Sequence, residues 1–179
     1  MLCYKAFQPG FKCRGYQYHM GKNVTGEANC HKNGFHCASD PADCLSYYPD
    51  IHSSVYCLVE AGGDIDEDGV DSKVSCTELS ILRVLTLEDY FLHILIHMAR
   101  NPDSKSSRAV QDRGTARNGY IIISGKNPFA RGSLGDILAM LKTGADGKAE
   151  QLGVLRVDGE TILPDIYYNI DGEAESNDK

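Results

Sequence analysis

The feature that most constrains the fold of this chain is the repeated alternation of short strand-like runs with turn residues. Residues 4–7 form a brief alternating run that ends at Pro9-Gly10. The run at 15–18 stops at Gly21, and the later runs at 120–124, 152–157 and 166–170 are bounded by turns such as Asp158-Gly159. A content of 18 Gly and 10 Tyr with no Trp fits this pattern. We therefore expect many short strands.

Two segments instead favour helices. Residues 41–48 follow Ser39-Asp40-Pro41, in which Ser39 or Asp40 is a candidate N-cap and Pro41 suits the first helical position. Residues 87–99 follow the candidate cap Thr86 and carry apolar side chains at helical spacing. The fold class predicted is α+β, with a mixed N-terminal domain of short strands and two helices, followed by a small C-terminal antiparallel β-meander.

The charge distribution suggests three segments within the net charge of -7. The acidic stretch 58–100 closes a mixed domain predicted over 1–100, and a polar, basic segment follows at 101–131. We interpret that segment as a connector with a vestigial repeat, because Gly114, Gly119 and Gly125 recur at short intervals. Residues 132–179 are expected to hold the β-meander and an acidic tail. A uniformly basic nucleic-acid binder is disfavoured.

The cysteines and the N-terminus bear on the compartment. Seven cysteines, an odd number, without an apolar export signal predict reduced thiols and a cytoplasmic protein. The longest apolar run, near 91–99, is too short to cross a bilayer, so no membrane association is expected. An alternative is a zinc site at the cluster of ligand-type residues Cys30, His36, Cys37 and Cys44, although the paired-cysteine spacing of structural zinc sites is missing. The main expectation is no metal and no cofactor.

A combination of motifs resembles an uncharacterised family of phage and prophage proteins. The motifs are Tyr4-Lys5-Ala6-Phe7, Cys13-Arg14-Gly15-Tyr16-Gln17-Tyr18, Gly34-Phe35-His36-Cys37, Tyr47-Tyr48-Pro49 and Gly63-Asp64-Ile65-Asp66. Members carry this N-terminal domain, then glycine- and alanine-rich repeats, then a small β segment similar to Val157-Asp158-Gly159-Glu160-Thr161. This chain has almost none of the repeat array. The resemblance implies a mobile-element origin and no particular activity.

Small phage proteins often disable host defence, so the first functional hypothesis is an inhibitor of anti-CRISPR or anti-restriction type in the host cytoplasm. Its partner would be a host nuclease or CRISPR effector complex with a basic nucleic-acid-binding groove. The groove would meet the acidic residues Asp64, Asp66, Glu67, Asp68, Asp71, Asp158, Glu160 and Asp165. RNA or DNA contacts are expected, if present, at Arg108, Arg113, Arg117 and Arg131.

The alternative hypothesis is an enzyme. Tyr4 and the run from Gly34 to Ser39 look a little like the core of an ADP-ribosyltransferase. That resemblance implies that Tyr4 and His36 contact NAD and that an acidic residue, Glu78 or the much later Glu160, polarises the sugar. No catalytic residue is expected if the protein acts only by binding.

Overall fold

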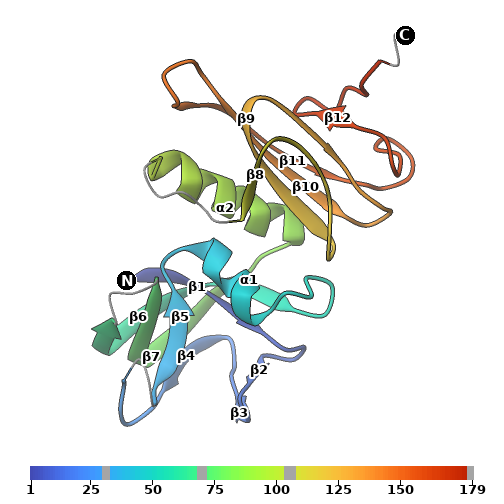
Figure 1. The fold of residues 1–179 in the computed structure, drawn as a ribbon. Coiled ribbons are helices and arrows are strands. Elements are labelled where there is room, and N and C mark those ends of the chain that lie inside the picture. The colour runs from blue at the N-terminus through green and yellow to red at the C-terminus, as the bar shows by residue number, and fades with distance from the viewer. Residues whose placement is uncertain (30–32, 68–71, 103–107, 177–179) are drawn as a thin grey trace. The chain divides into compact units, whose positions relative to one another are not determined.

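The structure is a computed structural model of the 179-residue chain, and it describes residues 1–29, 33–67, 72–102 and 108–176. The chain divides into two compact units, Met1–Thr86 and Leu87–Lys179. The boundary lies just before the predicted helix at 87–99, which therefore belongs to the second unit. Each unit has its own sheet and is described separately below (Figure 1).

The first unit is built on a closed antiparallel sheet. Its strands are β1 (Leu2–Phe7), β4 (Gly21–Val24), β5 (Phe35–Ala38), β6 (Val55–Glu67) and β7 (Lys73–Val84), in the order β4-β7-β5-β1-β6. The two longest strands, β6 and β7, also pair with each other, and this pairing closes the sheet on itself. A short hairpin of β2 (Lys12–Cys13) and β3 (Tyr16–Gln17) is attached to it. Closure gives each of these main strands except β4 a paired strand on both sides.

The core of this unit follows from the alternation of the strands. Along β1, Cys3, Lys5 and Phe7 share one face, and the aligned residues of β5, β6 and β7 complete a buried cluster. Most of the cysteines of the chain therefore act as small apolar groups. The cluster comprises Cys3, Phe7, Tyr18, Phe35, Cys37, Cys57, Val59, Ala61, Val74, Cys76, Leu79 and Ile81.

The helical segment of the first unit begins as predicted. Pro41–Asp43 form a 3-10 turn, η1, which continues into the short helix α1 (Cys44–Tyr47). The Asp40 side chain accepts a hydrogen bond from the Ala42 N–H at 2.9 Å, so Asp40 is the N-cap that the sequence suggested. The segment lies next to β1, and Leu45 and Cys44 are buried there.

The second unit begins with α2 (Leu87–Arg100), the helix predicted at 87–99. Four of the predicted apolar residues, Tyr90, Phe91, Ile94 and Leu95, are fully buried. The helix packs on β10 (Ile137–Thr143) and β11 (Ala149–Arg156), and the Phe91 ring lies 5.1 Å from that of Tyr120. The helical pattern therefore predicted both the element and its buried face.

The remaining strands of the second unit form a mixed sheet with parallel and antiparallel pairs. β8 (Ala109–Thr115) pairs in parallel with β9 (Tyr120–Arg131), and β9 pairs in parallel with β10. Successive strands thus lie side by side in parallel, with Ala109 paired with Ile122 and Tyr120 paired with Ile137. This is how the rungs of a solenoid stack. The antiparallel strand β11 and the short strand β12 (Tyr168–Asn169) complete the sheet.

These observations correct the predicted fold class. Strands account for 51% of the described structure and helices for 13%, so the molecule is predominantly β rather than α+β. The segment predicted as the connector, 101–131, contains β8 and β9. Its polar residues hid β8 because that strand is largely exposed. The predicted antiparallel meander contains one antiparallel hairpin, β10–β11, set against the parallel strand β9.

The β6–β7 ribbon supplies a test of this architecture. Gly63 has a φ of +67°, and a Cβ added there would lie 2.1 Å from Thr77 Oγ1, the atom that accepts the Asp64 N–H. Gly63→Ala should lower the free energy of unfolding by about 1–3 kcal/mol, through backbone strain and the lost hydrogen bond. Chemical denaturation measures this change. Gly26→Ala is the matched control, because Gly26 has open space around it and no positive φ; equal effects of the two changes would contradict the prediction.

Candidate functional site

A cavity of about 390 Å³ lies in the first unit, where β1 and β5 diverge. β1 pairs with β6 along its whole length but aligns with β5 at Tyr4 and Ala38. The cavity opens beside this short pairing, and the β2–β3 hairpin and α1 contribute to its walls. Its volume is in the range of small-molecule sites. It is lined by Tyr4, Lys5, Ala6, Cys13, Arg14, Tyr16, Tyr18, Thr25, Gly34, Phe35, His36, Cys37, Ala38, Asp43, Cys44, Tyr47, Tyr48 and Lys73.

The Lys5 side chain spans the divergence between the two strands. Lys5 is 6% exposed, and its ammonium group donates a hydrogen bond to the His36 carbonyl oxygen at 2.6 Å. The same ammonium lies 5.3 Å from the centroid of the Phe7 ring and 5.2 Å from that of Tyr18. A buried ammonium is stable only with such compensation, here a carbonyl and two aromatic faces. Lys5 therefore places a positive charge in the wall of the cavity.

Aromatic rings form one side of the cavity. The Tyr16 ring lies 4.6 Å from that of Tyr18 and 5.0 Å from that of Phe35, measured between centroids. Tyr18 and Phe35 are buried, whereas Tyr16 is 41% exposed. A flat ring of a ligand can therefore stack on Tyr16 without displacing the core beneath it.

His36 contributes a polar ring to the wall of the cavity. Its Nε2 atom is buried and has no hydrogen-bond partner among the described residues. Burial, reinforced by the charges of Lys73 and Lys5, lowers the pKa of His36, so the imidazole is neutral at pH 7. The ring also hydrogen-bonds the Asn29 backbone, which opposes this lowering of the pKa. Because the other ring nitrogen donates that bond, Nε2 of the neutral ring accepts one hydrogen bond. His36 is thus equipped to bind a polar atom of a ligand.

Asp43 is the acidic residue of the cavity wall, at the start of α1. Its carboxylate accepts a hydrogen bond from the Ser72 hydroxyl at 2.6 Å. Against this single acid stand the side chains of Lys5, Arg14 and Lys73. The lining is therefore net positive and favours an anionic ligand.

The structure brings together two of the three residues proposed for the enzyme hypothesis. Tyr4 and His36 both line the cavity. Glu78 does not line it: this residue lies on β7, half-buried, and its carboxylate pairs with Lys22 Nζ at 2.8 Å. The predicted position of the catalytic acid is therefore not supported by this geometry, and Asp43 is the acid that shares the cavity.

The acidic residues of the inhibitor hypothesis fall into both units. Asp64 and Glu67 are exposed on the last part of β6, and Asp66 between them is half-buried. Asp68 and Asp71 lie outside the described residues. The exposed residues Asp158, Glu160 and Asp165 belong to the second unit. The Asp158 carboxylate accepts three backbone N–H groups, those of residues 160–162, so it also stabilises a turn.

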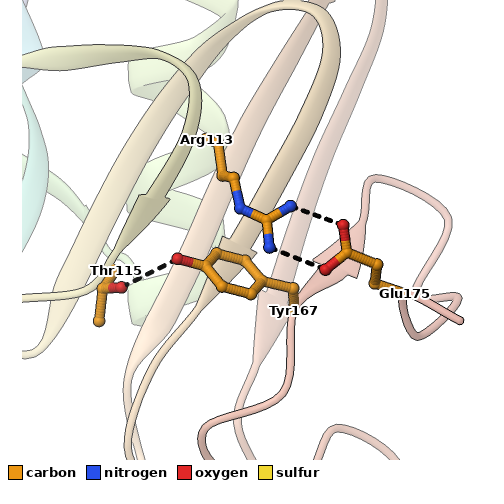
Figure 2. Close-up of polar contacts among 4 residues, drawn as sticks. All are labelled: Arg113, Thr115, Tyr167 and Glu175. Carbon is orange, nitrogen blue, oxygen red and sulfur yellow. Dashed lines mark hydrogen bonds and ion pairs between the residues drawn. The ribbon is translucent and has the colours of Figure 1, made fainter. Parts of the chain in front are cut away.

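The arginines proposed to touch nucleic acid include two that are engaged within the protein. Figure 2 shows the Arg113 guanidinium beside the Tyr167 ring and paired with both Glu175 oxygens. Arg113 Cζ lies 3.6 Å from the centroid of that ring, and Arg131 Cζ lies 4.8 Å from it. Arg131 Nε also donates to Thr115 Oγ1 at 3.0 Å. Arg117 is exposed, and Arg108 is half-buried.

The residues of the zinc alternative do not form a metal site in the part of the chain that the structure describes. No group of three His, Cys, Asp or Glu side chains there has a suitable arrangement. Hydrogen bonds with Cys3 and Cys76, together with burial, raise the pKa of the Cys37 thiol, which suits a core position. Cys44, the first residue of α1, is buried, and Cys30 lies outside the described residues.

Sequence reasoning missed Lys5, Cys13, Arg14, Asp43 and Tyr48 as members of one cavity. A lysine at an inward position of an otherwise apolar strand was a usable signal, because lysine is almost never buried without a specific partner. The others gave no such signal, since their proximity depends on how the hairpin and α1 are placed.

The contact in Figure 2 generates a pH prediction. The hydrogen-bonded pairing with Arg113 lowers the pKa of Glu175, so this contact is complete above the unfolded pKa of about 4.3 and is lost as pH falls through the lower folded value. Below about pH 4, the ring resonances of Tyr167 should shift in an NMR titration as the pair opens. Glu175→Gln should produce a similar shift at neutral pH, whereas Glu173→Gln should not. Tyr167 ring resonances that change neither at low pH nor in Glu175→Gln would contradict the role of the pair.

The comparisons with known proteins bear on the first unit of the chain and the start of α2. Among the described residues, no helix has both the length and the apolar character that crossing a membrane requires. No curated protein and no solved structure matches the chain. A family model described as a domain of unknown function (DUF7666) matches residues 1–93, which include the whole of the first unit and its cavity. The chain therefore belongs to the DUF7666 family.

Proposed function

We propose that the first unit is an ADP-ribosyltransferase-like domain that binds NAD in the cavity between β1 and β5. The observation that carries this proposal is the meeting of Tyr4 and His36, two residues distant in sequence, in the wall of one cavity. The stacking surface at Tyr16 suits a planar base or nicotinamide ring. The cations Lys5, Arg14 and Lys73 suit the phosphates of a dinucleotide.

Each residue has a distinct role in this proposal. Tyr4 binds the nicotinamide ribose, as the resemblance to ADP-ribosyltransferases implies. The buried Nε2 of His36 forms a hydrogen bond with a polar atom of the same half of NAD. Asp43 replaces Glu78 as the carboxylate that stabilises positive charge developing on the ribose when the nicotinamide leaves. Ser72 fixes the orientation of that carboxylate by donating to it. The acceptor of the ADP-ribose group is a nucleophile on a host macromolecule.

Binding of NAD is tested by isothermal titration calorimetry. Tyr4→Ala and His36→Ala should each weaken NAD affinity by about 10-fold or more, the cost of losing one buried hydrogen bond or contact of roughly 1.4 kcal/mol. Glu78→Gln is the matched control, because Glu78 lies outside the cavity. The NAD affinity of this variant should equal that of the native chain. The absence of any heat with NAD would overturn the proposal.

Transfer is tested separately with labelled NAD and host lysate. Asp43→Asn keeps the size of the side chain and removes its charge, so label transfer should fall by at least about 100-fold while NAD affinity stays within a few-fold. Transfer that survives in Asp43→Asn but is lost in Glu78→Gln would restore Glu78 as the acid and remove Asp43.

The phage-type inhibitor is a second candidate, favoured by the exposed carboxylates of Asp64 and Glu67 at the end of the β6 strand. It would bind the basic groove of a host nuclease or CRISPR effector complex. Capture of such a complex from a host lysate should weaken steeply between 50 mM and 300 mM salt, and Asp64→Asn/Glu67→Gln should lessen that dependence. Capture that is indifferent to both salt and this double substitution would exclude the electrostatic mechanism.

A further inference from the structure

We propose that Cys13 is a nucleophilic thiol that reacts covalently with small α,β-unsaturated carbonyl compounds entering the cavity. This goes beyond NAD binding and does not depend on it. The sequence pattern offered no reason to distinguish Cys13 from the other cysteines. Its distinction is geometric and concerns the groups that surround its sulfur.

Two donors converge on the Cys13 sulfur. The Tyr48 hydroxyl donates to Sγ at 3.2 Å, and the Lys5 ammonium lies 3.8 Å from the same atom. The thiolate, rather than the thiol, is the reactive form of cysteine, and an adjacent ammonium and a hydrogen-bond donor both stabilise its negative charge. Lys5 is itself fixed by its bond to the His36 carbonyl oxygen, so the charge stays close to the sulfur.

The hairpin that carries Cys13 also makes it accessible. Cys13 ends β2, and the turn at Arg14 and Gly15, both with positive φ, reverses the chain into β3. Cys13 is half-buried, whereas the five other cysteines in the described part of the chain are buried. Burial also raises the pKa values of Cys44 and Cys57 to about 12, which suppresses their reactivity.

An independent feature of the same cavity points to an occupant. The buried Nε2 of His36 has no partner among the described residues, although a buried polar atom ordinarily has one. Among α,β-unsaturated carbonyl compounds, an unsaturated amide offers an N–H donor for such an atom. The lining is also net positive, which favours the negative charge that develops on a carbonyl oxygen during conjugate addition.

The proposed step is a conjugate addition, and its atoms balance without an oxidant or a leaving group. The Cys13 sulfur forms a bond to the β-carbon of the electrophile as the carbon–carbon π bond breaks. The electron pair moves to the α-carbon and carbonyl oxygen as an enolate. The α-carbon then takes a proton in place of the one that the thiol lost, and the product is a thioether.

The adduct would also occupy the cavity. If NAD binds there, as proposed above, modification of Cys13 and NAD binding exclude each other. Only this competition depends on the proposed function. The reaction of Cys13 is measured without NAD. Failure of one proposal therefore does not entail failure of the other.

N-ethylmaleimide is the probe, applied to the full chain with Cys30→Ser, since Cys30 lies outside the described residues. Labelling of each cysteine is followed over time by peptide mass spectrometry, in buffer and in urea. Cys13 should react at least about 10-fold faster in the folded chain than in urea, whereas Cys44 and Cys57 should react only in urea. A folded rate for Cys13 equal to or below its rate in urea would overturn the proposal.

The source of the reactivity is tested with Tyr48→Phe, which removes only the hydroxyl, and Lys5→Met, which removes the charge at similar length. Each should slow labelling of Cys13 by about 5- to 10-fold. Continued protection of Cys44 and Cys57 shows that each variant is folded. Lys22→Met is the matched control, because it removes a lysine charge outside the cavity, where Lys22 pairs with Glu78; the labelling rate of Cys13 should be unchanged. Native rates in both Tyr48→Phe and Lys5→Met, or an equal loss in Lys22→Met, would show that the two donors do not activate Cys13.

Discussion

The first unit depends on a buried ammonium group between two strands that pair only briefly. Lys5 donates to the His36 carbonyl oxygen, and the rings of Phe7 and Tyr18 face its charge. A carboxylate partner would have neutralised the charge. The carbonyl and aromatic faces compensate it while leaving the local potential positive. The same side chain thus holds β5 beside β1 and gives the cavity its electrostatic character, so stability and binding chemistry share one residue.

Much of the local structure followed from the sequence, and its higher organisation did not. Asp40 capped the helical segment as expected, and the buried face of α2 matched the spacing of its apolar residues. These features depend on neighbours in the sequence. The parallel pairing of β8 with β9 depends instead on where the chain returns, and the exposed, polar residues of β8 carry no apolar alternation that would have revealed it. This is why β8 was missed in the segment expected to be a connector, whereas the apolar run at 120–124, which begins β9, was predicted.

The candidate site shows the same limit. Tyr4 and His36 were identified from a resemblance, and they share a cavity. Glu78 was nominated as the acid although it sits in no recognisable motif, and its carboxylate pairs with Lys22 outside the cavity. Asp43 and Cys13 enter the site through α1 and the β2–β3 hairpin, whose positions no spacing rule predicts. Residues on one strand can be inferred from periodicity, whereas residues joined by loops cannot.

The closure of the first sheet has a consequence for how the chain is made. β1 pairs with β6, and β6 pairs with β7, so the N-terminal strand finds its partners near the opposite end of the unit. During synthesis, Leu2–Phe7 must wait until the β6–β7 ribbon has left the ribosome before it can be enclosed. Such non-local pairing is slow to form. Until then, the apolar and thiol-bearing face of β1 has no partner strands to cover it, and such exposed apolar surface is prone to aggregation.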